Sequence, residues 1–413
     1  MKGILTMTER IATLERRTPN AERRTPNAER RTPNAERHNY AQKFPVRIAH
    51  IIGKMRNGGV ESVVMNYYRN IDRTKIQYDF IVDEDSSNSH IQAEMEALGG
   101  KIITVPPYQK QAHYQEALFA LFTQEKYPLV YSHINTLSVF PLFAAKRAGV
   151  PLRVAHNHST AGRGEFKRNV MKYILRPFAK IFPTHLCACS EYAGRWLFGD
   201  KAVDSGRVKV WPNAINVERF AYNPEVRARM RKSLNLDGKF VAGHAGRFMH
   251  QKNHMFLIDI FSALKKFKPE AVLLLVGDGP LQNMIREKVN ALGLSDDVIF
   301  TGSVYDMENY YQAMDVFILP SLYEGLPVVG SEVQVSGLPM LCANTVTPET
   351  KFCDKFRFMS LNNSPSEWAE EALRLCGGYT RRDMRIAATE HGFNIKTHAD
   401  ELTRWYCALL GIA

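Results

Sequence analysis

Glu324 and Glu332 lie in one short segment, Pro320-Ser-Leu-Tyr-Glu-Gly-Leu-Pro-Val-Val-Gly-Ser-Glu332, with seven residues between them. A helix that begins near Pro327 would place Glu332 about one turn inside it and leave Glu324 in the preceding loop. The two oxygens of a carboxylate can accept hydrogen bonds from vicinal hydroxyls, such as a ribose diol. Alternatively, the positive end of the helix dipole simply favours both glutamates. The spacing, with Gly325-Leu326-Pro327 between them, favours binding of a ribose by one carboxylate and of a second sugar by the other.

Three further loops combine glycine with charge or with the start of a helix. Gly246-Arg247 and then Lys252 follow one apolar run, and Gly277-Asp278-Gly279-Pro280 follows the next. Arginine can hold a phosphate through two hydrogen bonds, and lysine adds a point charge. Gly58-Gly59 precedes a helix whose free N–H groups and positive dipole end suit an anion. Each loop alone is equally consistent with a solvated surface turn, but together they indicate phosphate binding.

Short apolar strands alternate with helices in two halves of the chain, which predicts parallel, doubly wound α/β sheets. In the first half we expect strands at 46–52, 78–82, 101–105, 129–132, 152–155, 185–188 and 208–211, and helices at 60–70, 91–98, 114–124, 136–148 and 167–181. In the second half we expect strands at 240–245, 271–276, 298–301, 316–319 and 340–342, and helices near 253–267, 281–292, 307–313 and 365–375, the last capped by Ser364. Two such Rossmann-like domains leave a cleft that faces the carboxyl ends of both sheets, where the charged loops lie.

The first 44 residues differ in composition from the rest of the chain. They contain the heptapeptide Glu-Arg-Arg-Thr-Pro-Asn-Ala, repeated from Glu15, and residues 1–40 carry nine Lys/Arg and five Glu, which is +4 of the formal +12. Proline in each unit and the lack of apolar a and d residues exclude a coiled coil, so we expect a disordered tail. The alternative, a basic arm for nucleic acid or anionic lipid, is disfavoured by the interleaved glutamates. We therefore divide the chain into a tail (1–44) and two domains (45–212 and 213–413), and we allow the last helix to pack back on the first domain.

The composition argues against a membrane-spanning protein, a disulfide-rich protein and a nucleic-acid-binding protein. Forty-five per cent of the 413 residues are apolar, but no apolar run reaches ~18 residues, so we expect no membrane-spanning helix. Six cysteines without metal-type spacing fit a reducing compartment, and Cys187-Ala-Cys189 fits a buried strand. Because basic residues are not interleaved with aromatic ones in a known motif, we expect no nucleic-acid partner.

These loops resemble those of a known enzyme family. They occur in the order seen in family 4 retaining glycosyltransferases of the GT-B fold, and the sequence is most similar to the bacterial exopolysaccharide and capsule branch. The resemblance rests on Gly58-Gly59-Val60-Glu61, Gly246-Arg247 with Lys252, Gly277-Asp278-Gly279-Pro280, and Glu324 to Glu332. It extends from Pro45 to the C-terminus, and Pro212-Asn213-Ala214-Ile215 with Phe220 is similar to the family's Asn-Gly-Val-Asp linker, departing at Ala214 and Asn216.

The resemblance implies roles for individual residues. Arg247 and Lys252 would hold a diphosphate, Glu332 would bind the nucleotide ribose, and Glu324 would contact the donor sugar. The loop at Gly58 and Gly59 would approach the phosphate or the acceptor. The remaining donor-binding positions are Gly277, Asp278, Gly279, Gly325 and Leu326. The family's essential histidine maps to His158, with His156 and His133 as close rivals.

The implied reaction moves a sugar, with retention, from a nucleoside-diphosphate sugar to a saccharide or polyprenyl-linked acceptor. The residues do not distinguish UDP-sugars from GDP-mannose, and we favour a UDP-sugar as the donor. Positive groups fixed around the leaving diphosphate can replace a metal, so we expect neither a metal nor a cofactor and favour a front-face route. One sequence feature instead suggests a metal-dependent enzyme. Asp83-Glu84-Asp85 is a D-x-D motif of the type that binds a metal in glycosyltransferases of the other major fold. A nucleotide-sugar epimerase of the same fold and a basic nucleic-acid-binding protein are the alternatives.

Residues 166–182 mix basic and apolar side chains on an expected helix that Pro177 interrupts. This pattern is typical of a helix that lies on a membrane surface, and a core-facing helix with a solvated basic side explains it equally well. We expect a cytoplasmic protein that can bind the inner face of the plasma membrane through this segment.

Overall fold

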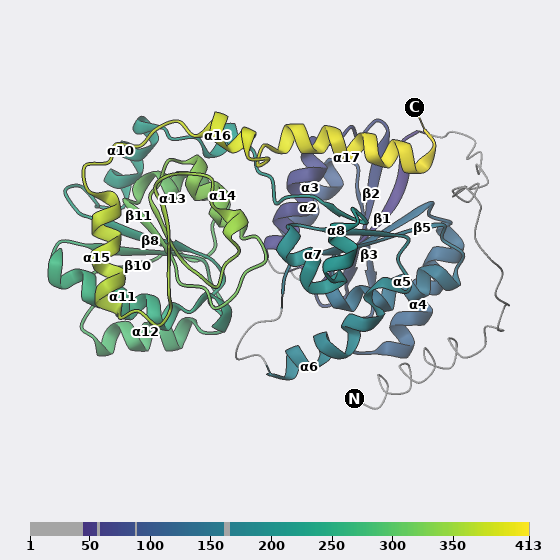
Figure 1. Ribbon diagram of the computed structural model, residues 1–413, viewed down its shortest axis with the longest axis horizontal. Helices are drawn as coiled ribbons and strands as arrows, with labels where there is room; N and C mark the ends of the chain where they lie inside the picture. Colours follow the sequence, from purple (N-terminus) through teal and green to yellow (C-terminus); the bar gives the residue numbers. More distant parts are fainter. Residues whose placement is uncertain (1–43, 56–57, 87–88, 161–165, 413) are drawn as a thin grey trace.

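The computed structural model describes residues 44–412 apart from 56–57, 87–88 and 161–165, and without the side chains of residues 89 and 166–169 (Figure 1). The predicted tail lies outside the described residues except for Phe44. Two sheets form the centres of two domains, with strand orders β3-β2-β1-β4-β5-β6-β7 and β10-β9-β8-β11-β12-β13, and neighbouring strands run parallel in both. The predicted fold class, α/β with two parallel sheets, is confirmed.

The N-terminal sheet is formed by continuous apolar runs, which is the pattern of strands covered on both faces. Its central members are buried along most of their length, and all eight residues of β2 are buried. The strands are β1 (Val46–Gly53), β2 (Ile76–Asp83), β3 (Lys101–Val105), β4 (Leu129–Ser132), β5 (Leu152–Asn157), β6 (His185–Ala188) and β7 (Val208–Val210). The helices are α2 (Gly59–Asn70), α3 (Ser89–Ala97), α4 (Gln111–Glu125), α5 (Val139–Arg147), α6 (Phe166–Leu175), α7 (Glu191–Phe198) and α8 (Asp200–Asp204).

The C-terminal sheet repeats this construction with shorter strands. The strands are β8 (Val241–Ala245), β9 (Val272–Val276), β10 (Val298–Phe300), β11 (Val316–Leu319), β12 (Met340–Ala343) and β13 (Phe356–Met359). The helices are α9 (Val217–Phe220), α10 (Pro224–Ser233), α11 (His254–Phe267), α12 (Gln282–Ala291), α13 (Met307–Ala313), α14 (Val328–Val335), α15 (Pro365–Cys376), α16 (Arg385–Glu390) and α17 (Ile395–Leu410).

Local sequence signals explain several element boundaries. Ser364 caps α15 as predicted, and it forms a reciprocal capping box with Glu367. The expected helix at 167–181 is divided: α6 ends at Leu175, and a 3₁₀ helix follows at Arg176–Lys180. Pro177 accounts for the break, because proline cannot donate the hydrogen bond that would continue the α-helix.

The order of the strands places four loops at the centre of the molecule. β1 pairs with β2 and β4, and β8 pairs with β9 and β11, so the chain reverses its winding at β1 and at β8. The loops that leave the carboxyl ends of such neighbouring strands diverge and open a crevice. In the C-terminal domain these are the loops that carry Arg247 and Glu324.

The last helix of the chain belongs spatially to the N-terminal domain. In Figure 1, α17 (yellow) extends away from the C-terminal sheet and lies over the N-terminal one. Its buried face joins one hydrophobic cluster with Ile48 of β1 and Tyr78 of β2, and the hydroxyls of Tyr78 and Tyr406 are 3.4 Å apart. The N-terminal core is therefore completed by residues from the far end of the chain.

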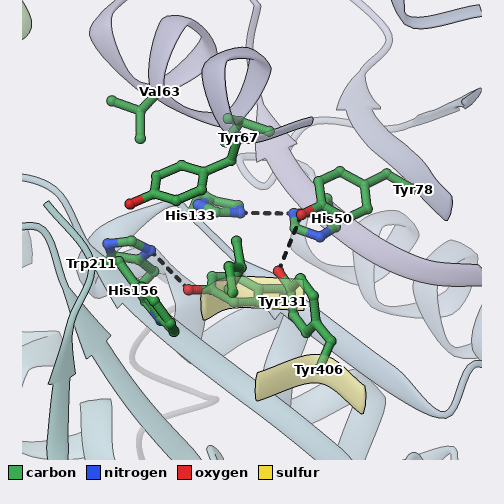
Figure 2. Close-up of a pocket in the computed structure, with 11 residues that line it drawn as sticks. His50, Val63, Tyr67, Tyr78, Tyr131, His133, His156, Trp211 and Tyr406 are labelled. Atoms are coloured by element: carbon green, nitrogen blue, oxygen red, sulfur yellow. Dashed lines mark hydrogen bonds between the residues drawn. The ribbon is translucent and has the colours of Figure 1, made fainter. Parts of the chain in front are cut away.

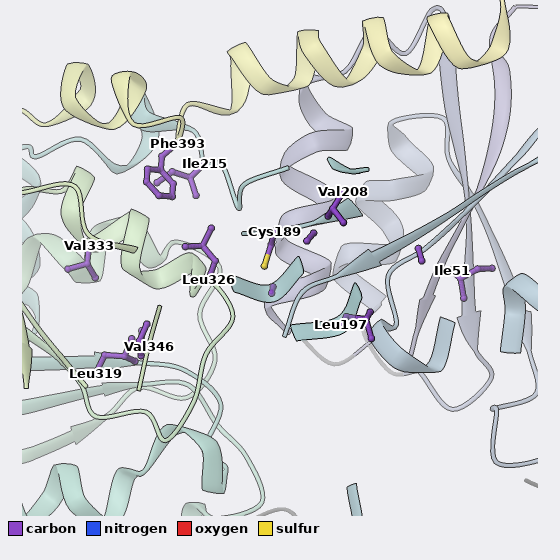
Figure 3. Close-up of a cluster of buried hydrophobic side chains, with 14 of the residues drawn as sticks. Ile51, Cys189, Leu197, Val208, Ile215, Leu319, Leu326, Val333, Val346 and Phe393 are labelled. Carbon is purple, nitrogen blue, oxygen red and sulfur yellow. The ribbon is translucent and has the colours of Figure 1, made fainter. Parts of the chain in front are cut away.

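A second cluster of buried side chains continues from one domain into the other. Figure 3 shows it running from Ile51 and Leu197 through Ile215 and Leu326 toward Leu319. Both Cys187 and Cys189 are buried and free, as the strand pattern predicted.

A carboxylate from the C-terminal domain also caps a helix of the N-terminal domain. The two oxygens of Glu349 accept hydrogen bonds from the backbone N–H groups of Glu191 and Tyr192, each at 2.9 Å, while Ser190 accepts the N–H of Ala193. The first N–H groups of α7 thus find their partners partly outside their own domain.

Replacement of Tyr406 by alanine should lower the free energy of unfolding by about 3–5 kcal/mol, because a fully buried aromatic side chain leaves a cavity in the N-terminal core. Urea titration measures the change. Ile386→Ala is the matched control, since that side chain is 76% exposed and its loss should have little effect. Equal effects of the two substitutions would contradict the assignment of α17 to the N-terminal core.

Candidate active site

A cavity of about 630 Å³ lies between the two domains. From the N-terminal domain, α2 and α3 line it with residues that include Asn66, Arg69 and Glu94. From the C-terminal domain, it is lined by the loops after β8, β9 and β10 and by parts of α9, α13 and α14. A cavity of this size, with polar groups converging from several elements, has the form of a small-molecule site.

The structure brings part of the predicted site together in this cavity. Arg247, Gly277, Asp278 and Glu332 all line it, although the first and last are far apart in the sequence. The predicted positions outside its lining are Gly58, Gly59, His158, Lys252, Gly279, Glu324, Gly325 and Leu326.

Two glycines allow the loops after β8 and β9 to lie in backbone contact. A Cβ atom on Gly277 would come within 2.3 Å of the carbonyl oxygen of Gly246, and one on Gly279 within 2.5 Å of the carbonyl oxygen of Phe248. Gly277 also has φ +132°, in the region that favours glycine. The backbone N–H of Phe248 donates to the carbonyl of Asp278 at 2.6 Å. The two loops therefore form a single rigid wall.

The two predicted cations differ in their surroundings. Arg247 forms no hydrogen bond or ion pair with any of the described residues, so its guanidinium is available to an anion in the cavity. Lys252 donates to Glu324 Oε1 at 2.7 Å, and Gln251 donates to Glu324 Oε2 at 3.0 Å. A Cβ on Gly246 would lie 3.1 Å from Lys252 Cε. The Lys252–Glu324 ion pair is therefore directly behind the loop that lines the cavity.

Glu332 lies in the first turns of α14, where the sequence placed it. Tyr311 donates its hydroxyl hydrogen to Glu332 Oε2 at 2.7 Å. Burial raises the pKa of Glu332 from 4.5 to about 7, and the Tyr311 hydrogen bond and the charge of Arg219 oppose that rise. The carboxyl group therefore changes its charge close to neutral pH.

The loop at 324–326 touches the N-terminal domain beside the predicted histidine. A Cβ on Gly325 would lie 2.5 Å from the carbonyl oxygen of His158, and Asn213 donates its side-chain N–H to the carbonyl of Leu326. The backbone of His158 is thus packed against the residue that follows Glu324. Gly58 instead ends the loop before α2, and a Cβ there would meet the Glu61 carboxylate at 2.6 Å.

The three candidate histidines lie in one buried group at the carboxyl ends of β4 and β5. His133 Nδ1 and His158 Nε2 are 3.0 Å apart, and His133 Nε2 and His50 Nδ1 are 2.9 Å apart. Figure 2 shows the bond from His133 to His50 and the bond from His156 to Tyr131. Burial lowers the pKa of His158 to about 3, so the ring is neutral at pH 7. A neutral imidazole has a single N–H, so the two hydrogen bonds of His133 must run in the same direction along the chain.

The nitrogens of His133, His156 and His158 lie within 4.8 Å of one another, which is close enough to suggest a metal site. The rings of His156 and His158, however, are stacked with centroids 3.9 Å apart and an interplanar angle of 22°. Imidazole lone pairs lie in the ring plane, so nearly parallel rings cannot direct them at one ion without turning. Hydrogen bonds engage both nitrogens of His133 and one nitrogen each of His156 and His158.

The D-x-D motif forms the turn after β2. Glu84 pairs with Lys110 at 2.9 Å, and Asp85 pairs with Lys54. Asp83 is buried, and its burial raises the pKa of its carboxyl group. Two of the three carboxylates are thus already bound to lysines.

The expected membrane segment presents both apolar and basic side chains to solvent. Val170, Tyr173 and Ile174 are among the exposed large apolar residues, while Lys180 is also exposed. Lys172 is different, because it donates to the carbonyl of Thr160 at 3.0 Å. None of the helices in the described part of the chain is both long and apolar enough to span a bilayer.

Several residues that line the cavity carried no sequence signal. Arg219 of α9 donates to the carbonyl of Tyr305 and to Glu308, both at 2.8 Å, and His90 of α3 stacks on Tyr305. Arg219 and Tyr305 are 86 positions apart in the sequence, and His90 and Tyr305 belong to different domains. No local sequence motif could reveal such contacts.

Comparison with known proteins identifies both domains. Residues 57–219 match the model of Glycosyltransferase Family 4, and residues 226–391 match that of Glycosyl transferases group 1. The chain is 32% identical over 377 residues to the putative glycosyltransferase EpsF of Bacillus subtilis, covering 89% of this chain and 97% of that protein. It is 25% identical to the capsular polysaccharide biosynthesis glycosyltransferase CapH of Staphylococcus aureus, over 87% of this chain and 98% of CapH.

Two further matches have informative names. A UDP-Gal:alpha-D-GlcNAc-diphosphoundecaprenol alpha-1,3-galactosyltransferase of Escherichia coli is 30% identical over 55% of this chain and 60% of its own length. The solved structure of Anabaena Alr3699/HepE in complex with UDP-glucose superposes with a TM-score of 0.71 at 18% identity, covering 88% of this chain and 99% of that one. The latter shows that the fold is of the GT-B type.

Glu332→Gln should raise the free energy of unfolding by about 3 kcal/mol at pH 8 and have little effect near pH 4.5. The pKa of Glu332 is higher in the folded protein than its ordinary 4.5, so its stabilising contribution is complete below pH 4.5 and is lost as pH rises through about 7. Glutamine cannot ionise, so the variant keeps its stability as pH rises. Urea titrations from pH 4.5 to 8 measure the free energy of unfolding of both proteins, and Glu287→Gln, at an exposed position, is the control. A difference in free energy that does not change with pH would contradict the assignment.

Proposed function

The chain belongs to the glycosyltransferases that combine a family 4 domain with a group 1 domain, and from this premise we propose that it transfers a sugar from a UDP-sugar to a saccharide of a bacterial polysaccharide. The name of CapH, a capsular polysaccharide biosynthesis glycosyltransferase, supports the pathway. The complex of HepE with UDP-glucose supports the donor. The observation that carries the proposal is the cavity between the domains, in which Arg247 and Glu332 lie together.

The charged and polar residues of the cavity suggest where each part of the donor binds. Arg247 holds the diphosphate, together with the N–H groups at the start of α14, which no side chain caps and which lie beside Val329 in the cavity wall. Glu332 accepts hydrogen bonds from the ribose diol. The sugar then points toward Glu324 and the backbone of His158, where the two domains touch.

Catalysis in this arrangement rests on charge. Negative charge grows on the departing diphosphate as the anomeric carbon becomes cationic, and positive groups already in place stabilise it without reorganisation. Arg247 is available for this task, and Lys252 lies behind the same loop with Glu324 as its partner. His158, neutral because of its burial, serves as a hydrogen-bonding group beside the donor sugar. We assign retention by a front-face route, in which the acceptor hydroxyl attacks from the side of the leaving diphosphate and gives its proton to it.

The reaction needs no metal in this proposal. The two aspartates of the D-x-D motif are Asp83, which is buried at the end of β2, and Asp85, which pairs with Lys54, and neither lines the cavity that carries Arg247. Arg247, Lys252 and the amino terminus of α14 supply the positive charge that a metal would otherwise bring.

The acceptor is a lipid-linked saccharide. The Escherichia coli relative acts, according to its name, on a diphosphoundecaprenol-linked sugar. In this chain, α6 and the turn after it expose Tyr173 and Ile174 next to Arg176 and Lys180. Apolar side chains flanked by cations suit the surface of an anionic membrane, which would bring the N-terminal domain to a lipid-linked acceptor.

Arg247→Met should lower kcat about 100-fold, because loss of one preorganised charge at the leaving group costs about 3 kcal/mol of barrier. Release of UDP from UDP-sugars in the presence of a diphospholipid-linked saccharide measures the rate. Arg229→Met is the control, since that arginine is exposed on α10.

The same assay separates the alternatives. The wild-type enzyme should release UDP only with acceptor present and should remain active in EDTA. Turnover of the sugar without nucleotide release would indicate an epimerase, and strict dependence on manganese would assign the D-x-D motif to a metal. A trapped glycosyl-enzyme adduct would contradict the front-face route.

Reversal of charge at Arg176 and Lys180, each to glutamate, should weaken binding to anionic liposomes at least about tenfold, since each basic residue near such a surface contributes about 1 kcal/mol. Co-sedimentation with phosphatidylglycerol vesicles measures it. The paired control is Lys232→Glu with Lys239→Glu, two exposed lysines of the C-terminal domain. Unchanged binding in the first variant would remove the membrane role of this segment.

A further inference from the structure

Three buried histidines form a hydrogen-bonded chain that ends beside the proposed donor site. His133 is in the middle, with its Nε2 2.9 Å from Nδ1 of His50 (Figure 2) and its Nδ1 3.0 Å from Nε2 of His158. All three side chains are more than nine-tenths buried, and burial lowers the pKa of each imidazole, so the rings are neutral at pH 7. A neutral ring carries one hydrogen, so the donors can run from His50 toward His158 or in the opposite direction.

The surroundings of His50 favour one of the two directions. If His158 donated to His133, and His133 to His50, then His50 would carry its hydrogen on Nε2, a buried atom without a partner among the described residues. An unpaired buried N–H group is rarer in proteins than an acceptor with an unused lone pair. The cavity of about 20 Å³ beside His50 is lined mainly by aromatic and aliphatic side chains, a poor site for a water molecule, which needs two to four polar partners. The hydrogen of His50 therefore belongs on Nδ1.

The position of the hydrogen on His50 fixes the other two. His50 donates from Nδ1 to Nε2 of His133, and His133 donates from Nδ1 to Nε2 of His158. His158 must then carry its own hydrogen on Nδ1. That Nδ1 is buried and has no partner in the part of the chain that the structure describes. A buried N–H group needs an acceptor, and an oxygen atom of a bound ligand would supply it.

Two further contacts hold His158 in place. Its backbone N–H donates to Oδ1 of Asn135 at 2.7 Å, and its ring stacks on that of His156 with centroids 3.9 Å apart. Its carbonyl oxygen is packed against Gly325, the residue after Glu324. The ring of His158 is therefore fixed in orientation next to the loop that we assign to the donor sugar.

We propose that His133 and His50 are positioning residues, which hold His158 in the tautomer that donates a hydrogen bond from Nδ1 to an oxygen of the bound donor. The inference rests on the proposed function, because it takes the donor sugar to lie beside His158. If the ring could exchange its tautomer, it would present a lone pair to that oxygen part of the time. The chain through His133 prevents this exchange, so the N–H group is in place before the donor arrives, as preorganised catalytic donors are.

NMR of the protein with isotopically labelled nitrogen in its histidine rings tests the tautomers directly, and single substitutions assign the signals. In the wild-type protein, the hydrogens of His50, His133 and His158 should all be on Nδ1. In His133→Phe, which removes the middle of the chain, His158 should no longer show a single tautomer. A hydrogen on Nε2 of His158 in the wild type would overturn the proposal, whether or not the protein is active.

A double-mutant cycle tests whether His133 acts through His158. His133→Phe should lower kcat by about 10- to 100-fold, no more than the usual effect of one preorganised donor, and leave KM for the UDP-sugar nearly unchanged. In a His158→Ala background the same substitution should cause no further loss of kcat. His133→Asn, whose amide can donate near the position of Nδ1, should retain most of the wild-type rate. The control is His113→Phe, at an exposed position of α4, which should leave the rate unchanged.

The kinetic results can also contradict the proposal. Equal losses of kcat from His133→Phe with and without the side chain of His158 would indicate general damage to the core, and a wild-type rate in His133→Phe would show that the tautomer has no influence. Calorimetric binding of UDP by His133→Phe, as tight as in the wild type, would support the proposal by showing that the donor site is still formed. Absence of sugar transfer by the wild-type protein would instead refute the proposed function, while the tautomers are measured without any activity.

Discussion

Parallel strands can pair only when every connection crosses back over a face of the sheet, and this constraint places all their carboxyl ends at one edge. Here two such edges face each other across the cavity, and the winding of each sheet reverses at β1 and β8. Arg247 and Glu332 reach the same space because the loop of Arg247 follows β8 and the helix of Glu332 follows β11, which are neighbouring strands at that reversal. The sheets set the approximate positions of these residues. The glycines that let the loops after β8 and β9 touch, and the hydrogen bond from Tyr311 to Glu332, then fix the local geometry.

Much of this geometry could be predicted from the sequence, because the buried strands are continuous apolar runs and the charged loops directly follow them. β13 escaped prediction, since Phe356–Met359 is short and contains Arg357. The pairing of Lys252 with Glu324 was also not foreseen, because a sequence motif gives each residue a role but not its neighbour. The sequence analysis also missed Arg219, Tyr305 and His90. Their contacts join different helices or different domains, so they produce no recognisable pattern in the sequence.

Electrostatic character divides the two halves of the site. The N-terminal side contributes a buried chain of neutral imidazoles in which His133 links His158 to His50. The C-terminal side contributes a guanidinium without a partner among the described residues and a carboxyl group that titrates near neutrality. The C-terminal domain therefore supplies the charged groups that complement a charged donor. The N-terminal domain supplies hydrogen bonds that remain the same over the physiological pH range. The fixed direction of the hydrogen bonds through His133 also means that the three rings cannot change tautomer independently.

The position of α17 has a consequence for the biosynthesis of the protein. Ile48 and Tyr78 emerge early from the ribosome, but Tyr406, which covers them, emerges almost last. At ordinary rates of translation the intervening chain takes on the order of tens of seconds to make. During that interval the face of the N-terminal sheet that α2 and α17 cover together lacks the side chains of α17. Nascent chains of this protein should consequently depend on a chaperone until the final helix is released.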